Sequence, residues 1–319
     1  MRSAGIPRSR RCRRTCGSTC TATRLAIRRP WWPRSGVDGI CLVRERMPLP
    51  ADLLARLPGL RFIAFTGARN PSCDHVAAAA RGIPVSNTPG GPSKASTAEV
   101  TWALILAADK QVVPAASGLL AGHWRTDAAG RPYPLPGVLE GRCLGLLGLG
   151  DIGQRVAAVG RAMGMEVIAW SPNLSAERAQ AGGAALVGRQ DLFRRADVLS
   201  VHMVLAPATR AMIASDDLSL MKPTAMLVNT SRAGLIDADA LQHAMAAGRP
   251  GKLAIDVFAN EPVPADDPLR PLYRLPQVTM LPHLGYVNDR VFDAFANGLA
   301  AVIRGWIAGK PVSVMNGIV

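Results

Sequence analysis

Apolar and polar positions along the first part of the chain have the spacing of short strands and helices. Apolar runs with the length and composition of strands are GICLV (39–43), LRFIAFT (60–66) and IPVSN (83–87). Between them lie two segments with helical spacing, PADLLARL (50–57) and CDHVAAAARG (73–82), the second of which ends at a glycine. This order predicts a small βαβ domain that ends near the NTPGG turn.

The longer second part of the chain alternates continuous apolar strands with helices. Ser96 and Glu99 predict a capping box at the head of the helix TAEVTWALILAAD. After the polar, Pro- and Gly-rich segment 122–137 come seven strand candidates: CLGLLG from 143, EVIAWS from 166, AALV from 184, DVLSVHM from 197, AMLVNTS from 225, KLAIDVF from 252 and VTMLPH from 278. Apolar strands separated by helices predict a parallel sheet that is buried on both faces.

Three glycines lie between the first of these strands and the helix QRVAAVGRAMG. Gly148, Gly150 and Gly153 have the GxGxxG spacing of a turn whose backbone N–H groups bind a pyrophosphate. The spacing alone is a weak signal, and its position between a strand and a helix makes it specific. Asp151 within the turn is unexpected, because a carboxylate facing two phosphates would weaken binding. Since helix N-termini favour acids, we expect Asp151 to point away from the phosphates.

Polar side chains follow successive strands of the predicted sheet. They are Ser171, His202, Arg232, the segment 256–261 and His283. In a doubly wound sheet, ligands bind beyond the carboxyl ends of the strands. A guanidinium, a carboxylate and an imidazole at that edge fit the reduction of a keto acid, which needs an anchor for the substrate carboxylate and a proton donor with a partner group.

From residue 37 to 319 the chain resembles the NAD-dependent D-isomer-specific 2-hydroxyacid dehydrogenase family. The motifs that carry the resemblance are RGIPVSNTPG, STAEVTWALILA, LGLLGLGDIG, VNTSRAGLIDADAL, AIDVFANEP, LPHLGY and GWIAGKPVSVMN, in this order. The resemblance implies an α/β fold, in which a Rossmann-type doubly wound parallel sheet is inserted into a smaller flavodoxin-like βαβ domain. The substrate-binding domain would comprise residues 37–93 plus 288–319, and the dinucleotide-binding domain residues 94–287.

The resemblance also implies roles for individual residues. Arg232 would bind the substrate carboxylate, His283 would transfer the proton, and Glu261 would hold the other imidazole nitrogen. The backbone N–H groups of Thr66 and Gly67 would bind the substrate anion, with an ordinary strand-to-helix turn as the alternative. His202 would lie near the cofactor, with a purely structural role as the equally open alternative. The cofactor-binding residues would be Thr101, Gly148, Gly150, Asp151, Ile152, Gly153, Ser171, His202, Thr230 and Asp256.

The implied function is hydride transfer between a nicotinamide cofactor and a small D-2-hydroxy acid or 2-keto acid. The implied activity is similar to that of a glyoxylate or hydroxypyruvate reductase, or to that of a phosphoglycerate dehydrogenase. NAD is the expected cofactor, but Ser171 stands where an acid that bonds the ribose is usual, so NADP stays open, with Arg178 as the nearest cation. Two alternatives remain: a non-catalytic NAD-sensing corepressor-like protein, and an inactive product with a damaged N-terminus.

Charge changes this picture only at the N-terminus. Residues 1–36 contain ten arginines and no Asp, Glu or Lys, so they supply +10 of the net charge of +14 and leave +4 for the rest. The body of the chain therefore predicts no nucleic-acid partner. The favoured interpretation of the head is a disordered or non-native, frameshifted start; a transit peptide and a nucleic-acid-binding arm are the alternatives. The family's first strand and helix would fall here, and nothing in the head matches them.

Cysteine usage and hydropathy bear on location and partners. No apolar run approaches the ~18 residues of a membrane span, and Cys41, Cys73 and Cys143 favour reduced thiols in a cytoplasmic protein. Three further cysteines in the head are spaced by four residues, without a nearby histidine, and do not match a zinc site, so no metal is expected. Because the family pairs through its nucleotide domains, the resemblance implies a homodimer.

Overall fold

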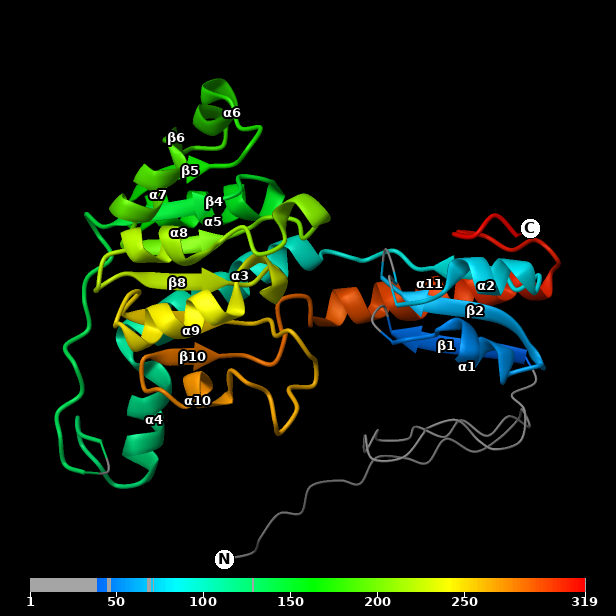
Figure 1. The fold of residues 1–319 in the computed structure, drawn as a ribbon, viewed down its shortest axis with the longest axis horizontal. Helices are drawn as coiled ribbons and strands as arrows, with labels where there is room; N and C mark the ends of the chain where they lie inside the picture. The colour runs from blue at the N-terminus through cyan, green and yellow to red at the C-terminus, as the bar shows by residue number, and fades with distance from the viewer. Residues whose placement is uncertain (1–38, 45–46, 68–69, 71, 128, 319) are drawn as a thin grey trace, which may run out of the picture.

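The computed structural model describes residues 39–44, 47–67, 70, 72–127 and 129–318, which form two parallel sheets (Figure 1). The smaller sheet has three strands in the order β1-β2-β3. Its strands are β1 (Gly39–Arg44), β2 (Leu60–Thr66) and β3 (Val85–Asn87), and the helices around it are α1 (Ala51–Ala55), α2 (His75–Ala80) and α11 (Asp289–Ile307). The predicted strands and helices of this part are all present, whereas the predictions for residues 1–36 lie outside the described residues.

The small sheet is covered on both faces by apolar side chains. On one face, Leu54 of α1 and Ala78 of α2 belong to the same buried cluster as Ile63 of β2. On the other face, Phe62 of β2 stacks on Trp306 of α11, with ring centroids 5.3 Å apart. Helix α11 therefore connects the end of the chain to the sheet formed near its beginning (Figure 1).

The larger sheet has seven strands, all parallel, in the order β6-β5-β4-β7-β8-β9-β10. This is the strand order of a Rossmann sheet with one strand added at the edge. The strands are β4 (Cys143–Leu147), β5 (Glu166–Trp170), β6 (Ala185–Leu186), β7 (Val198–Val201), β8 (Met226–Asn229), β9 (Lys252–Ile255) and β10 (Val278–Met280). All seven strand candidates are found, and the predicted α/β class with a doubly wound parallel sheet is confirmed.

Helices cover both faces of the large sheet and separate two apolar cores. One core contains residues of α3 (Ser93–Lys110), α5 (Asp151–Ala162) and α6 (Ala176–Ala181). The other contains residues of α7 (Arg189–Arg195), α8 (Ser215–Leu220), α9 (Ala238–Ala246) and α10 (Arg270–Tyr273). The remaining helices are α4 (Val112–Leu120) and the short 3₁₀ turns η1 (Pro207–Thr209) and η2 (Ala233–Leu235).

The register of the large sheet aligns the ends of its central strands. Trp170 pairs with Leu147, Leu147 with Val201, and Val201 with Asn229. Asn229 pairs with Ile255, which pairs with Met280. The polar residues that follow these strands in the sequence therefore leave the sheet along one edge, called here the carboxyl rim.

Two local predictions differ from the structure around α3. The predicted capping box at Ser96 and Glu99 is wrong, because α3 begins at Ser93 and Ser96 is buried inside it. Pro92 precedes the helix, and nothing between it and Ser96 interrupts helical conformation. Helix α4 was not predicted; it begins after Gln111, whose φ of +55° bends the chain by 63°. Within the described residues no single helix is long and apolar enough to cross a membrane, although α3 and α4 together reach that length and hydropathy.

Candidate active site

The glycine turn between β4 and α5 has the shape that a dinucleotide requires. Gly148 has a φ of +100°, and a Cβ there would lie 2.6 Å from the His202 carbonyl oxygen. A Cβ on Gly153 would lie 2.4 Å from the Gly148 carbonyl oxygen, so this glycine allows the helix to pack closely on the turn. A Cβ on Gly150 would meet nothing within 4 Å, which leaves open space at the head of α5. Gly148 thus allows the tight turn and Gly153 the close packing of the helix. Gly150 leaves room for a pyrophosphate to approach the backbone.

Asp151 is the first residue of α5 and forms an ion pair with Lys94 of α3. About three fifths of each side chain is exposed, at 61% for Asp151 and 63% for Lys94. The hydrogen bond from the Lys94 ammonium lowers the pKa of Asp151, so the carboxylate is charged at neutral pH. Lys94 therefore brings a positive charge to the head of α5. This charge opposes the repulsion that the Asp151 carboxylate alone would exert on a phosphate.

We expect Asp151→Asn to keep or improve the affinity for NADH, and Asp151→Arg to do the same. The reason is that each change removes a negative charge near the proposed pyrophosphate site and leaves the Lys94 ammonium in place. The measurement is a fluorescence titration with NADH at low and high salt, since exposed charges are screened by salt. Lys94→Met is the matched control and should weaken binding. A clear loss of affinity in Asp151→Asn would show that the carboxylate has a positive role.

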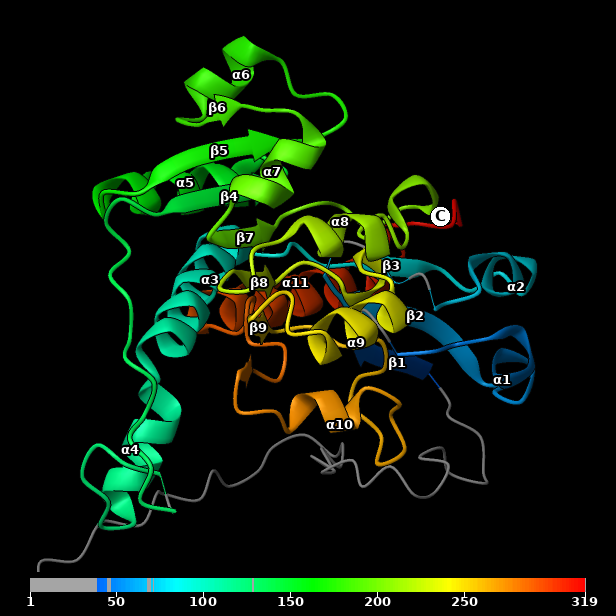
Figure 2. The ribbon, with the colours of Figure 1, turned by 60° about the vertical axis from the view of Figure 1, so that its left-hand side comes forward.

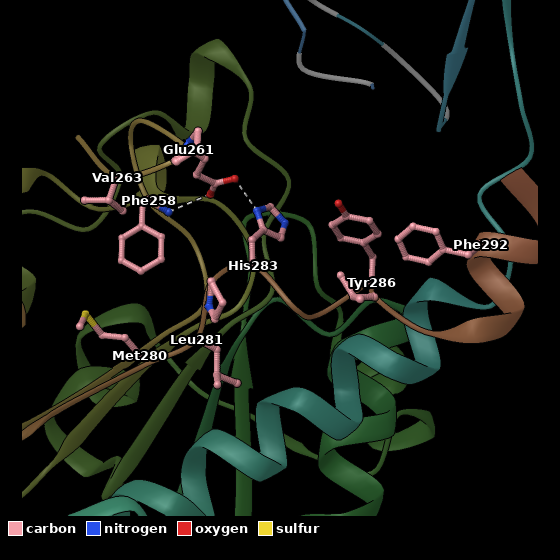
Figure 3. Close-up of a pocket in the computed structure, with 11 residues that line it drawn as sticks. Phe258, Glu261, Val263, Met280, Leu281, His283, Tyr286 and Phe292 are labelled. Carbon is pink, nitrogen blue, oxygen red and sulfur yellow. Dashed lines mark hydrogen bonds and ion pairs between the residues drawn. The ribbon is translucent and has the colours of Figure 1, made fainter. Parts of the chain in front are cut away.

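His283 and Glu261 form a hydrogen-bonded pair beyond the carboxyl ends of β9 and β10. His283 Nδ1 lies 2.7 Å from Glu261 Oε2, and Glu261 Oε1 accepts the backbone N–H of Phe258 at 3.0 Å (Figure 3). Both side chains are mostly buried, with exposed fractions of 15% and 19%. Because both carboxylate oxygens are held, the orientation of the imidazole is fixed, with Nε2 on the side of the ring away from Glu261 (Figure 3).

Asp256 holds the segment that follows His283. It is fully buried after β9, and its two carboxylate oxygens accept the backbone N–H groups of Leu284 and Gly285, each at 2.7 Å. Burial raises the pKa of Asp256, and the two N–H groups oppose this rise by stabilising the carboxylate. Asp256 thus shapes the His283 turn through the backbone, and its contact with the cofactor stays a prediction.

Arg232 lies in the loop after β8, which Asn229 shapes. Asn229 Nδ2 donates to the Arg232 carbonyl oxygen at 3.0 Å, and Asn229 Oδ1 accepts the Ser231 N–H at 3.0 Å. The Arg232 side chain is exposed, and its Nη1 donates to the Ser231 carbonyl oxygen at 2.7 Å. The structure therefore brings Arg232 to the same rim as the His283–Glu261 pair. The hydrogen bond between His283 and Glu261 does not involve Arg232.

Thr101 and Thr230 join α3 to the end of β8. Their hydroxyl oxygens are 2.8 Å apart, and the Thr101 hydroxyl also donates to the Thr97 carbonyl oxygen at 2.8 Å. Thr101 is fully buried and Thr230 is 5% exposed. The two hydroxyl groups are thus engaged with each other, and their contact with the cofactor stays a prediction.

His202 follows β7 and packs against the glycine turn. Although part of the residue is exposed, its Nδ1 is shielded from solvent and has no hydrogen-bond partner in the described part of the chain. Its Nε2 lies 2.9 Å from the Ser200 hydroxyl. Burial lowers the pKa of His202 to about 4, so the ring is neutral at pH 7. A shielded nitrogen without a partner fits the predicted place beside a cofactor that would supply one.

The two remaining predicted contacts lie at the ends of β5 and β2. Ser171 is half-buried after β5, and the loop beyond it is closed by Arg178, whose Nη1 donates to the Asn173 carbonyl oxygen at 3.0 Å. In the other loop, Gly67 has a φ of +99°, and its N–H donates to Thr88 Oγ1 at 3.2 Å. A substrate anion would have to replace Thr88 as the acceptor, and this anion site stays a prediction.

A cavity of about 760 Å³ adjoins the His283–Glu261 pair. Figure 3 shows Phe258, Val263 and Met280 on one side of the pair and Tyr286 and Phe292 on the other. The cavity therefore connects the carboxyl rim of the large sheet with the beginning of α11, which packs on the small sheet.

Sequence reasoning missed several residues that belong to this site. Lys94 is 57 positions from Asp151 in the chain, and no local pattern links the two. Tyr286 lies edge-on to His283, with ring centroids 5.5 Å apart, and its only signal was its place in the LPHLGY motif. Phe292 had no signal, because an apolar residue in the first turn of a helix is usually part of a core.

Known proteins are similar to this chain over most of its length. The profile of the family described as D-isomer specific 2-hydroxyacid dehydrogenase, NAD binding domain, matches residues 102–285. A glyoxylate reductase of Aeropyrum pernix is 41% identical over 271 residues, which are 84% of this chain and 80% of that protein. A D-3-phosphoglycerate dehydrogenase of Mycobacterium leprae is 36% identical over 87% of this chain, which spans about half (52%) of that relative. A solved phosphoglycerate oxidoreductase from Vibrio cholerae has a TM-score of 0.77 and 35% identity, covering 85% of this chain and 84% of its own.

Proposed function

The chain belongs to the D-isomer-specific 2-hydroxyacid dehydrogenase family, and from this membership we propose that Arg232, Glu261 and His283 are its catalytic residues. It is an NAD-dependent oxidoreductase that acts on CH–OH donors and moves hydride between the cofactor and a 2-hydroxy or 2-keto acid. The predictions of family, reaction and cofactor are thereby confirmed. The NAD-sensing alternative is not favoured, because the relatives are named as reductases and dehydrogenases.

The observation that carries the assignment of the catalytic residues is the 2.7 Å contact between His283 and Glu261 beside the cavity. The nicotinamide, when bound, supplies the hydride. His283 would give a proton from Nε2 to the carbonyl oxygen during reduction and would take it back during oxidation. Glu261 would hold the imidazole in place through its contact with Nδ1. Arg232 would bind the substrate carboxylate through two parallel N–H···O bonds.

The proposed cofactor site extends along the carboxyl rim from the glycine turn. The N–H groups of Asp151 and Ile152 at the head of α5 would bind the pyrophosphate. Thr101, Thr230, His202 and Asp256 would then lie toward the nicotinamide end. At the other end Ser171 replaces the usual acid, so the repulsion that this acid would exert on a 2′-phosphate is removed, and the Arg178 guanidinium lies beside the loop. We propose NAD as the preferred cofactor and NADP as a second one.

We expect the purified protein to oxidise NADH, and NADPH more slowly, when it is given glyoxylate, hydroxypyruvate or a related 2-keto acid. The measurement is the loss of absorbance of the reduced nicotinamide, with a fluorescence titration of both cofactors as the control for binding. Cofactor binding without turnover on a broad panel of 2-keto acids would contradict the enzyme assignment and favour the NAD-sensing alternative.

The domain division follows from where the chain passes between the two sheets. We propose a substrate-binding domain of residues 37–93 plus 288–319 and a dinucleotide-binding domain of residues 94–287. The starts of α3 at Ser93 and of α11 at Asp289 support these boundaries, since each helix begins where the chain leaves one sheet for the other (Figure 1). A cytoplasmic location is also proposed, supported by Cys73 and Cys143, which are buried free thiols.

Helix α4 and the loop after it support a homodimer as the proposed assembly. This arm extends away from the large sheet (Figure 2), and α4 has no buried residue. Its large apolar side chains are exposed: Val112 at 50%, Val113 at 58%, Leu119 at 59% and Leu120 at 91%. Exposed apolar groups in this number are typical of an interaction surface.

We expect the protein to have twice the mass of its 33.7 kDa chain in analytical ultracentrifugation, and Leu120→Glu to shift it toward the monomer. The reason is that a charge in an apolar interface is desolvated without a partner. The matched control is Val76→Glu, since Val76 of α2 is also exposed, at 80%. A wild-type protein that sediments as a monomer contradicts the proposal.

A further inference from the structure

The cavity beside the catalytic pair is much larger than the smallest substrates of the reaction need. Its volume of about 760 Å³ is in the range that encloses whole organic ligands. Glu261 and His283 are part of its lining, so the cavity lies directly beside the imidazole to which the substrate carbonyl would bind. With the carboxylate at Arg232 and the carbonyl at His283, carbon 3 of the substrate and the atoms beyond it would occupy the remaining space.

The wall of the cavity is apolar on both sides of the pair. Phe258, Val263 and Met280 form one side, and Tyr286 and Phe292 the other (Figure 3). Two of these side chains are still well exposed, Met280 at 39% and Phe292 at 48%. Covering them with an apolar ligand would remove that surface from water, which is the main favourable contribution to binding in such pockets.

The charge of the wall disfavours an anionic side chain. In the part of the chain that the structure describes, Glu261 and His283 are the only acidic or basic residues that line the cavity, and no Lys or Arg does. Within this described lining, a phosphate or a second carboxylate on the substrate would be desolvated close to the Glu261 carboxylate, and no Lys or Arg of the lining would offset its charge. The carboxylate that every 2-keto acid carries would instead bind Arg232, which does not line this cavity.

We propose that the physiological substrate is a 2-keto acid, or the corresponding D-2-hydroxy acid, with a branched aliphatic or aromatic side chain that occupies this cavity. The inference rests on the proposed function of the catalytic residues. It adds to that function the chemical class of the side chain that the substrate carries. In the reduction, hydride passes from NADH to the carbonyl carbon and the His283 proton passes to the carbonyl oxygen, giving the 2-hydroxy acid and NAD⁺.

The test compares kcat/KM for five 2-keto acids with NADH. The expected order places 4-methyl-2-oxopentanoate and phenylpyruvate above glyoxylate, hydroxypyruvate and 3-phosphohydroxypyruvate. The difference should reach about 10–200-fold, the range that one methylene contributes in an apolar pocket. A higher kcat/KM for glyoxylate or for the phosphorylated acid overturns the inference while the proposed function stands. If no 2-keto acid is reduced although NADH binds, the proposed function fails and the inference fails with it.

A variant pair links the preference to the cavity wall. Phe292→Arg places a cation on the wall and should lower kcat/KM for phenylpyruvate by about 10-fold or more, while improving that for 3-phosphohydroxypyruvate. Ile307→Arg is the control, because Ile307 is exposed at 70% on the same helix, 15 residues and roughly 22 Å further along. An unchanged substrate order in folded Phe292→Arg would show that the side chain of the substrate does not reach this wall.

Discussion

Replacing His283 with asparagine should lower kcat for 2-keto acid reduction by about 10²–10⁴-fold, the range usual for loss of a general acid. Asparagine is chosen because His283 has a φ of +56°, a conformation that asparagine adopts more readily than most residues. The turn held by Asp256 should therefore survive. Since His283 would act on the substrate carbonyl, NADH affinity should stay nearly unchanged.

The control for this prediction is Glu261→Gln. Glutamine can still contact the imidazole but carries no charge, so its loss of kcat should be smaller than that of His283→Asn. NADH affinity is measured by fluorescence titration, and folding by circular dichroism. If His283→Asn loses NADH binding in proportion to turnover, His283 has a structural role and the proposed mechanism is wrong.

Local patterns were sufficient to predict most of the fold. The run 60–66 matches β2 at both ends, because an apolar segment bounded by glycines has few alternatives to a buried strand. The start of α3 was placed wrongly, because Ser96 and Glu99 have the spacing of a cap but lie within a helix that already starts after Pro92. Helix α4 has the sequence VVPAASGLL, which is apolar along most of its length and contains a proline and a glycine, so it lacks the one-sided apolar pattern from which helices are usually recognised.

The candidate site was predictable where a motif specifies it and unpredictable where the fold assembles it. Glu261 and His283 were assigned from short motifs, and their 2.7 Å contact agrees with that assignment. The apolar wall of the cavity comes from the end of β10, from the loops after β9 and β10 and from α11, and only tertiary structure brings them together. The ion pair of Lys94 with Asp151 is of the same kind, because the first residues of α3 and α5 meet only in the folded chain.

Replacing Arg232 with lysine should lower kcat/KM for 2-keto acids by about 10²–10³-fold, comparable to removing one preorganised donor from a catalytic site. Lysine keeps the charge, but its ammonium is a single point donor and cannot bind a carboxylate through two parallel bonds. The loss should appear in KM as well as in kcat, because the substrate carboxylate is bound both before and during the reaction.

The matched control for Arg232→Lys is Arg249→Lys. Arg249 is also an exposed arginine that donates to a backbone carbonyl, that of Ser219, but it precedes β9 and so lies at the opposite edge of the sheet from Arg232. The control should retain the wild-type kcat/KM, and both variants should bind NADH normally. A wild-type kcat/KM in Arg232→Lys would show that charge alone suffices at this position. The bidentate anchor would then have to be another group at the carboxyl rim, because a substrate held by a single contact would not keep its carbonyl aligned with His283 Nε2.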